Sequence, residues 1–295
     1  MTPPEQPAPR DGVEDYHYAD ATELLDALSP RYHRLWEGNA SAWIFRGHAN
    51  ADWELKATAV RDLGLFAKYG IDSRSGNPGQ PPDEEIPEWC RRAFLQNKLL
   101  RQFREGLDHS GLAIPSRSPT IDGSELQRQT SNAEPPPEVF PLMALAQHYG
   151  LPTMLLDWTR RGWVASYFAA EEAADKDRRK AATHLAVWAL YRGDMVSPSE
   201  GPYFYDAPGG TNPNLHAQSG LFTFHLGVDA PSLEQHFVRM KKITEGGPPL
   251  RRLTLPTTEA AKLLRLLSEE GIHGASMFPG HYGVVRAMRE RALWE

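Results

Sequence analysis

The chain has 295 residues, of which 40% are hydrophobic and 10% aromatic, enough to bury a sizeable core in one large domain or two small ones. Its formal net charge is −6, so it lacks the excess of basic residues that is typical of nucleic-acid-binding domains. The single cysteine, Cys90, excludes an internal disulfide and a cysteine-rich zinc site, and favours a reducing, cytoplasmic setting. The sequence begins without a signal peptide, and no apolar stretch reaches the roughly 18 residues of a membrane-spanning helix, so we expect no membrane partner.

Residues 1–15 are polar and rich in proline, which predicts a flexible leader before a single domain over residues 16–295. Two further stretches rich in Pro, Gly and Ser, near 71–87 and 114–137, predict surface insertions within that domain. The apolar spacing in this half predicts a strand over 42–45 and helices over 21–36, 88–107 and 139–149. Gly150 would end the third helix.

The second half of the chain contains most of the predicted strands. Apolar runs and alternation predict strands over 183–191, 221–226 and 250–255. Helical spacing predicts helices over 163–174, 258–270 and 284–294. Helices early and strands mostly late are typical of an α+β domain, and we expect one central mixed or antiparallel sheet flanked by helices.

Arg46 and Asp157 each lie inside an apolar run, where an unpaired charge would be costly. Arg46 is followed by Gly47 at the expected end of a strand, so its guanidinium is a candidate clamp for a phosphate or carboxylate, with Gly47 allowing close backbone approach. Asp157 is a candidate general base or ribose-binding carboxylate. The alternative is that Arg46 and Asp157 form a structural pair.

Four further groups could contribute to a site, and each has a structural alternative. Gln147, His148 and Tyr149, followed by Thr153, could form a pocket rim or cap a helix. Thr159 could contact a ligand or act as the N-cap of the next helix, a position that Asp157 could also take. Gln218 could place its amide over a substrate or serve the turn at Ser219-Gly220. Tyr203 and Tyr205 form an aromatic cluster that either stacks on a base or packs onto the domain.

These motifs together resemble the FRG-domain family, named for its Phe-Arg-Gly triplet. The matching residues, in chain order, are Phe45-Arg46-Gly47, Trp53, Leu55, Arg61, Gln147-His148-Tyr149-Gly150, Leu155-Leu156-Asp157-Trp158-Thr159, Ala165, Tyr167, Phe168, Gln218-Ser219-Gly220-Leu221-Phe222-Thr223 and Phe278-Pro279. The sequence departs from the family at Gly280, where an aspartate usually follows the Phe-Pro pair.

The layout of the family also resembles that of ADP-ribosyltransferases, which implies an ADP-ribosyltransferase-like core and NAD as substrate. By this resemblance Arg46 would hold the dinucleotide, Gln218 would stand where a catalytic glutamate is often found, and Asp157 would supply the acid. The implied function is transfer of ADP-ribose from NAD to a protein or nucleic-acid acceptor, as in a bacterial toxin or anti-phage effector. No metal is expected.

Two other functions remain open. The same pocket could sense a nucleotide, or dock a partner, without chemistry. A nucleic-acid-processing enzyme is the third alternative, although the sequence has no compact carboxylate or His-Asp set that would hold a catalytic metal. The motifs of P-loop NTPases, dinucleotide-binding Rossmann folds, zinc metalloproteases and serine hydrolases are all absent.

Overall fold

A computed structural model describes residues 12–31, 33–36, 40–72, 87–115, 137–175, 182–193, 201–208, 212–225, 232–240 and 248–295. Most of the predicted leader, and the parts of the two predicted insertions at 73–86 and 116–136, lie outside these residues.

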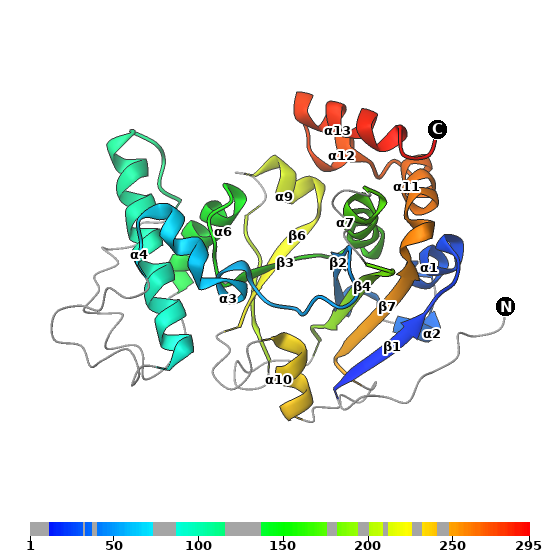
Figure 1. The fold of residues 1–295 in the computed structure, drawn as a ribbon, viewed down its shortest axis with the longest axis horizontal. Helices are drawn as coiled ribbons and strands as arrows, with labels where there is room; N and C mark the ends of the chain where they lie inside the picture. The colour runs from blue at the N-terminus through cyan, green and yellow to red at the C-terminus, as the bar shows by residue number, and fades with distance from the viewer. Residues whose placement is uncertain are drawn as a thin grey trace.

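The described residues form one seven-stranded sheet that runs through the molecule (Figure 1). Its strands are β1 (Val13–His17), β2 (Trp43–His48), β3 (Leu155–Thr159), β4 (His184–Tyr191), β5 (Tyr203–Tyr205), β6 (Gly220–Phe224) and β7 (Leu250–Pro256). They lie in the order β1-β7-β4-β2-β3-β6-β5. Only the β1–β7 pair is parallel among these described strands, and the other pairs are antiparallel. The predicted α+β class with a mixed sheet is therefore confirmed.

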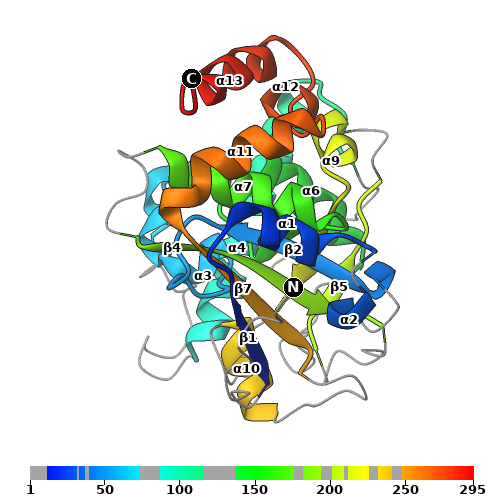
Figure 2. The ribbon, with the colours of Figure 1, turned by 90° about the vertical axis from the view of Figure 1, so that its right-hand side faces the viewer.

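Helices cover both faces of this sheet. They are α1 (Ala21–Leu28), α2 (His33–Trp36), α3 (Thr58–Arg61), α4 (Glu88–His109), α6 (Phe140–His148), α7 (Gly162–Ala174), α9 (Pro213–Ala217), α10 (Leu233–Met240), α11 (Ala260–Glu269), α12 (Gly274–Met277) and α13 (His281–Arg291). One core lies between the sheet and α1, α7 and α11, which stack above it in Figure 2. The other core contains residues of α4, α6 and α10.

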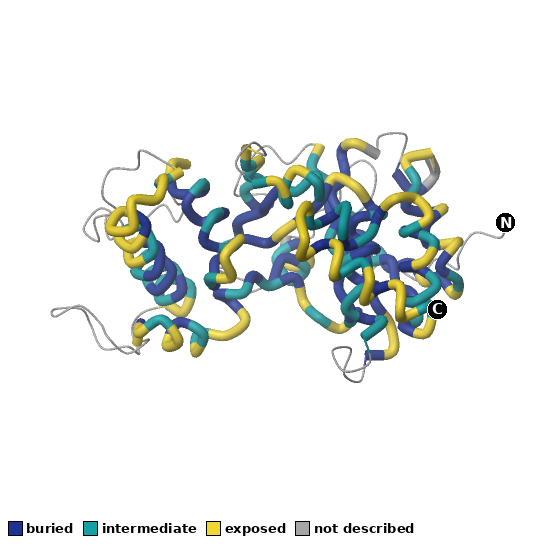
Figure 3. The backbone as a smooth tube through the Cα atoms, turned by 90° about the horizontal axis from the view of Figure 1, so that it is seen from above, coloured by how far each residue is buried: buried dark blue, intermediate teal, exposed yellow. Residues whose placement is uncertain are grey.

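The two cores give the molecule an elongated form. Helix α4 lies at one end, with α3 and α6 beside it, and the β1–β7 edge lies at the other (Figure 1). Figure 3 shows the buried segments along the middle of the long axis, and the exposed ones around its periphery. The sheet therefore links two groups of helices, and any site between β2 and β3 lies where these groups meet.

Several elements differ from the sequence predictions. The helix predicted over 21–36 is interrupted, because Ser29 precedes Pro30 and adopts an extended conformation, which the helical region disfavours before proline. The predicted leader is too long, because Val13–Asp15 belong to β1 and pair with β7, more than 200 residues later in the chain. β3 and β5 were not predicted as strands. Both strands are short. Their pairing partners either lie far away in the sequence or lack a clear alternation of polar and apolar residues.

Candidate functional site

The sheet is split between β2 and β3. β2 pairs with β4 along all of Trp43–His48 but with β3 only at Phe45 and Thr159. Beyond that pair the guanidinium of Arg46 fills the place of the missing ladder. Its Nη1 donates a 2.7 Å hydrogen bond to the main-chain oxygen of Asp157 and lies 3.5 Å from the carboxylate Oδ2 of Asp157. The sequence candidates Arg46 and Asp157 are thus brought together, at an opening in the sheet.

His48 holds the other side of the Arg46 guanidinium. The two side chains lie two residues apart on β2 and therefore on the same face. Nε of Arg46 donates to Nε2 of His48 at 3.1 Å, so Nδ1 must carry the imidazole proton, which it donates to the Trp53 carbonyl at 3.2 Å. Burial, followed by the charge of Arg46, lowers the pKa of His48 to about 3. His48 is therefore a neutral acceptor at pH 7.

Arg46 also belongs to a row of polar residues that crosses four strands. The register pairs Asp15 with Arg252, Arg252 with Trp188, and Trp188 with Arg46, so all four side chains share one face. Nε of Arg252 donates to Asp15 at 2.6 Å, and its guanidinium lies 5.5 Å from the centroid of the Trp188 ring. The row ends at the Arg46 guanidinium, which contacts Asp157 on β3 across the split.

The guanidinium of Arg46 is only partly satisfied. Its Nη2 has no hydrogen-bond partner within the part of the chain that the structure describes, and the side chain is 16% exposed. Burial lowers the pKa of Arg46, and the charge of Asp157 opposes this effect. Arg61, an exposed residue of α3, lies close enough that its charge lowers the pKa of both Arg46 and His48. Two guanidinium groups are thus within electrostatic reach of the split.

The apolar run around Asp157 does not bury its side chain. Its side chain is 62% exposed although its neighbours Leu156 and Trp158 are buried. The reason is local, because β2 and β3 separate at this level and leave the Asp157 side chain without a covering neighbour. The carboxylate is therefore accessible to a ligand, and its partner Arg46 lies at the base of the split.

Gly47 has a different role from the one its position suggested. A Cβ built at this position would lie 2.0 Å from the carbonyl oxygen of Ala165 and 2.7 Å from the amide nitrogen of Ala169. Both atoms belong to α7, so the missing side chain lets α7 pack directly on β2. Close backbone approach is required here, as expected, but the element that approaches is a helix of the same chain.

Thr159 and Gln218 contact each other and connect the split to the C-terminal helices. The hydroxyl of Thr159 donates to the Gln218 carbonyl at 2.7 Å and accepts from the Arg161 amide at 3.1 Å. The Gln218 side-chain amide donates to the Met277 carbonyl at 3.1 Å. The N-cap prediction is wrong for both Thr159 and Asp157, because Arg161 occupies that position of α7.

The Gln147–Thr153 segment forms a neighbouring structural unit. Gly150 adopts a positive φ of 83°, and Leu151 N–H returns to the Ala146 carbonyl, which ends α6 in a Schellman motif as predicted. The buried Thr153 donates to the Gln147 side chain. His148 and Tyr149 are exposed, and no hydrogen bond, ion pair or ring contact among described residues joins either of them to Arg46 or Asp157.

The aromatic cluster packs onto the fold. Tyr203 and Tyr205 form β5, and both rings stack on Phe140 of α6, with centroid distances of 4.7 and 5.3 Å. These contacts favour the packing interpretation over base stacking.

Sequence reasoning missed several residues around Arg46. His48 could have been found, because it lies two residues after Arg46 on a predicted strand and must share its face. Trp188 and Arg252 could not, since only the strand register places them beside Arg46. Arg61 and Trp53 were noted for their place in the family pattern alone.

No helix in the described part of the chain has the length and apolar character needed to cross a bilayer. The same residues contain no group of three or more His, Cys, Asp or Glu side chains suited to a metal ion.

Comparison with protein families matches residues 41–178 to the FRG domain. The match extends from the start of β2 through Arg46, Asp157 and α7, and ends before Gln218. Neither the curated proteins nor the solved structures give a match to the chain. The chain thus carries an FRG domain at residues 41–178.

Proposed function

We propose that the chain binds NAD or a related nucleotide at the split between β2 and β3, with Arg46 holding the diphosphate. One observation carries this proposal: the largely buried guanidinium of Arg46 is fixed on two sides and still has Nη2 free among the described residues. A planar guanidinium with a free N–H edge is suited to phosphate oxygens.

Two neighbours of Arg46 favour an anion, although the carboxylate of Asp157 lies 3.5 Å from its Nη1. His48 is neutral, so it fixes the guanidinium without neutralising it. Arg61 adds a second positive charge nearby. Because Arg46 is already held in position, binding would require little further ordering of its long side chain.

We further propose that the bound NAD is turned over by ADP-ribosyl transfer. Cleavage of the nicotinamide–ribose bond develops positive charge at the anomeric carbon, and a carboxylate nearby stabilises that charge. Asp157 is accessible and lies beside Arg46, which suits this role. The acceptor would be a protein or nucleic acid, and a toxin or anti-phage effector would act in this way on a cellular target.

Asp157→Asn tests the chemical step, because it removes the carboxylate charge and keeps the side-chain size. We expect NAD affinity to change less than threefold and nicotinamide release to fall at least tenfold. Equal release by both proteins would contradict the role of Asp157. An absence of NAD binding would contradict the whole proposal.

A second candidate, nucleotide binding without turnover, is supported by Gln218. Its side-chain amide is occupied by the Met277 carbonyl, so it is engaged in holding α12 rather than free for a substrate. For this candidate we expect tight NAD binding with no nicotinamide release, in the wild type and in Asp157→Asn alike.

A further inference from the structure

A cavity of about 530 Å³ lies over β1, β7 and β4, on the side of Arg46 that faces away from Asp157. The loop 51–54 and α10 complete its lining. Trp188 of β4, the cross-strand neighbour of Arg46, belongs to this lining. Because adjacent strands are about 5 Å apart, the cavity begins roughly one strand spacing from Arg46. Its volume lies in the range of about 300–1,000 Å³ typical of small-molecule sites.

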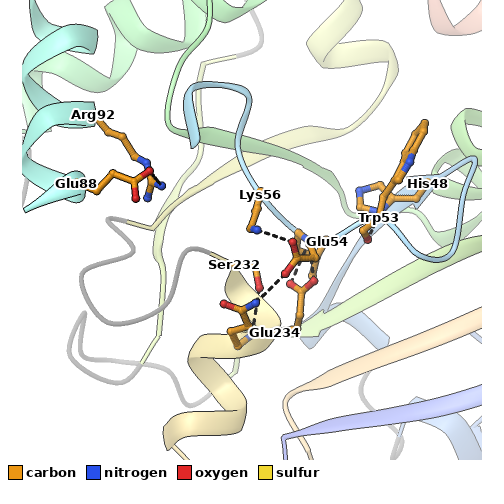
Figure 4. Close-up of polar contacts among 10 residues, drawn as sticks. His48, Trp53, Glu54, Lys56, Glu88, Arg92, Ser232 and Glu234 are labelled. Atoms are coloured by element: carbon orange, nitrogen blue, oxygen red, sulfur yellow. Dashed lines mark hydrogen bonds and ion pairs between the residues drawn. The ribbon is translucent and has the colours of Figure 1, made fainter. Parts of the chain in front are cut away.

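The charges that line the cavity largely cancel. They belong to Asp15, Asp52, Glu54, Glu234, Arg239 and Arg252. Arg252 pairs with Asp15. Glu54 pairs with Lys56, as Figure 4 shows. Glu234 is engaged with the loop, because both of its carboxylate oxygens accept from the Leu55 N–H, at 2.9 and 3.0 Å. Asp52 and Arg239 add one charge of each sign, so the cavity favours an uncharged polar ligand over an ion.

Two polar groups of the lining have no partner within the part of the chain that the structure describes. Trp188 is 3% exposed, and its Nε1–H is buried without a hydrogen-bond acceptor. A buried donor without a partner is costly, and an acceptor atom of a ligand would remove that cost. The exposed carboxylate of Asp52 is the second group, because only the main-chain N–H of this residue is engaged, with Asn50. The cavity thus offers one donor in its wall and one acceptor at its rim.

We propose that this cavity binds the adenosine half of the dinucleotide, an inference that rests on the proposed function. That function places the nicotinamide–ribose bond at Asp157 on β3, so the other half would extend from Arg46 in the opposite direction, over β4. Adenine is uncharged, and one of its ring nitrogens would accept from Nε1–H of Trp188. The ribose hydroxyls would donate to the Asp52 carboxylate, as they do to an acidic residue in dinucleotide-binding folds.

Isothermal titration of two variants with NAD tests this inference. Asp52→Ala removes the acceptor for the ribose, and Trp188→Phe removes the N–H donor while keeping an aromatic ring. We expect each variant to bind NAD about fivefold or more weakly than the wild type. Asp108→Ala, at an exposed acid near the end of α4, is the matched control and should bind like the wild type. Circular dichroism would verify folding, and the exposed Asp52 keeps the test decisive if Trp188→Phe does not fold.

Adenosine, which has no phosphate, separates this inference from the proposed function. We expect adenosine to bind the wild type, and Arg46→Ala to lose NAD binding while its affinity for adenosine stays within about twofold. Adenosine binding without NAD binding would support the cavity assignment and contradict the diphosphate clamp. NAD binding that depends on Arg46, with no adenosine binding or with unchanged NAD affinity in Asp52→Ala, would overturn the cavity assignment alone.

Discussion

His48 makes the stability of the fold depend on pH. Its pKa is about 3 in the folded protein, against 6.5 when unperturbed, because the ring is buried beside Arg46. Between these two values the unfolded chain binds a proton that the folded chain does not. Stability from this residue is therefore fully present above pH 6.5 and is lost as the pH falls toward 3.

The size of the effect follows from the two pKa values. His48 should reduce the free energy of unfolding by about 1.4 kcal/mol between pH 7.5 and 5.5, and by about 2.7 kcal/mol at pH 4.5. His48→Gln removes the titrating group while keeping one donor and one acceptor for Trp53 and Arg46. Between pH 7.5 and 5.5 we expect the free energy of unfolding of the variant to fall by about 1.4 kcal/mol less than that of the wild type.

Urea unfolding followed by tryptophan fluorescence at pH 7.5, 6.5 and 5.5 measures this difference. Other titrating groups contribute equally to both proteins and cancel in the comparison. The control is His109→Gln, at an exposed position at the end of α4. Its free energy of unfolding should change with pH as that of the wild type does. If the free energy of unfolding of His48→Gln changed with pH as much as that of the wild type, the assignment of His48 as a buried neutral acceptor would be refuted.

Two further substitutions test how the site is held. Gly47→Ala should destabilise the protein by at least about 2 kcal/mol in urea unfolding, because its Cβ would overlap α7. Gly106→Ala, a helical position with open space around it, should instead stabilise it by about 0.5–1 kcal/mol, and equal effects would refute the packing argument. Glu290→Ala should cost about 2–4 kcal/mol, because the buried carboxylate accepts from Tyr167 and the Gly274 amide. Increased proteolysis of α13 would accompany this loss, and unchanged cleavage would contradict it.

Much of the fold could be predicted from periodicity. Helices α4, α6, α7 and α11 and strands β4 and β7 all lie where the apolar spacing placed them, within a few residues. These elements have a strong local signal, since each buries one face or is buried throughout. β1 lacked such a signal, because its position depends on a parallel partner at the far end of the chain.

The candidate site was predicted only in part. Arg46 and Asp157 do meet, because the largely buried guanidinium of Arg46 needs partners in any fold, although the carboxylate of Asp157 is itself exposed. The split that exposes Asp157, and the row that places Trp188 beside Arg46, depend on strand order and register. Neither property can be derived from a single sequence, because the strands involved are separated by more than 100 residues.

Isothermal titration with NAD, comparing the wild type with Arg46→Ala, tests the central claim most directly. Loss of charged hydrogen bonds to the diphosphate should weaken binding about 10–100-fold or more. Arg46→Lys keeps the charge but not the planar N–H edge, so its affinity for NAD should lie between those of the wild type and Arg46→Ala. Arg101→Ala, which removes an exposed arginine on α4, should bind like the wild type. The account predicts NAD binding that is lost in a folded Arg46→Ala variant. Binding that is absent from the wild type, or unchanged in Arg46→Ala, would contradict it.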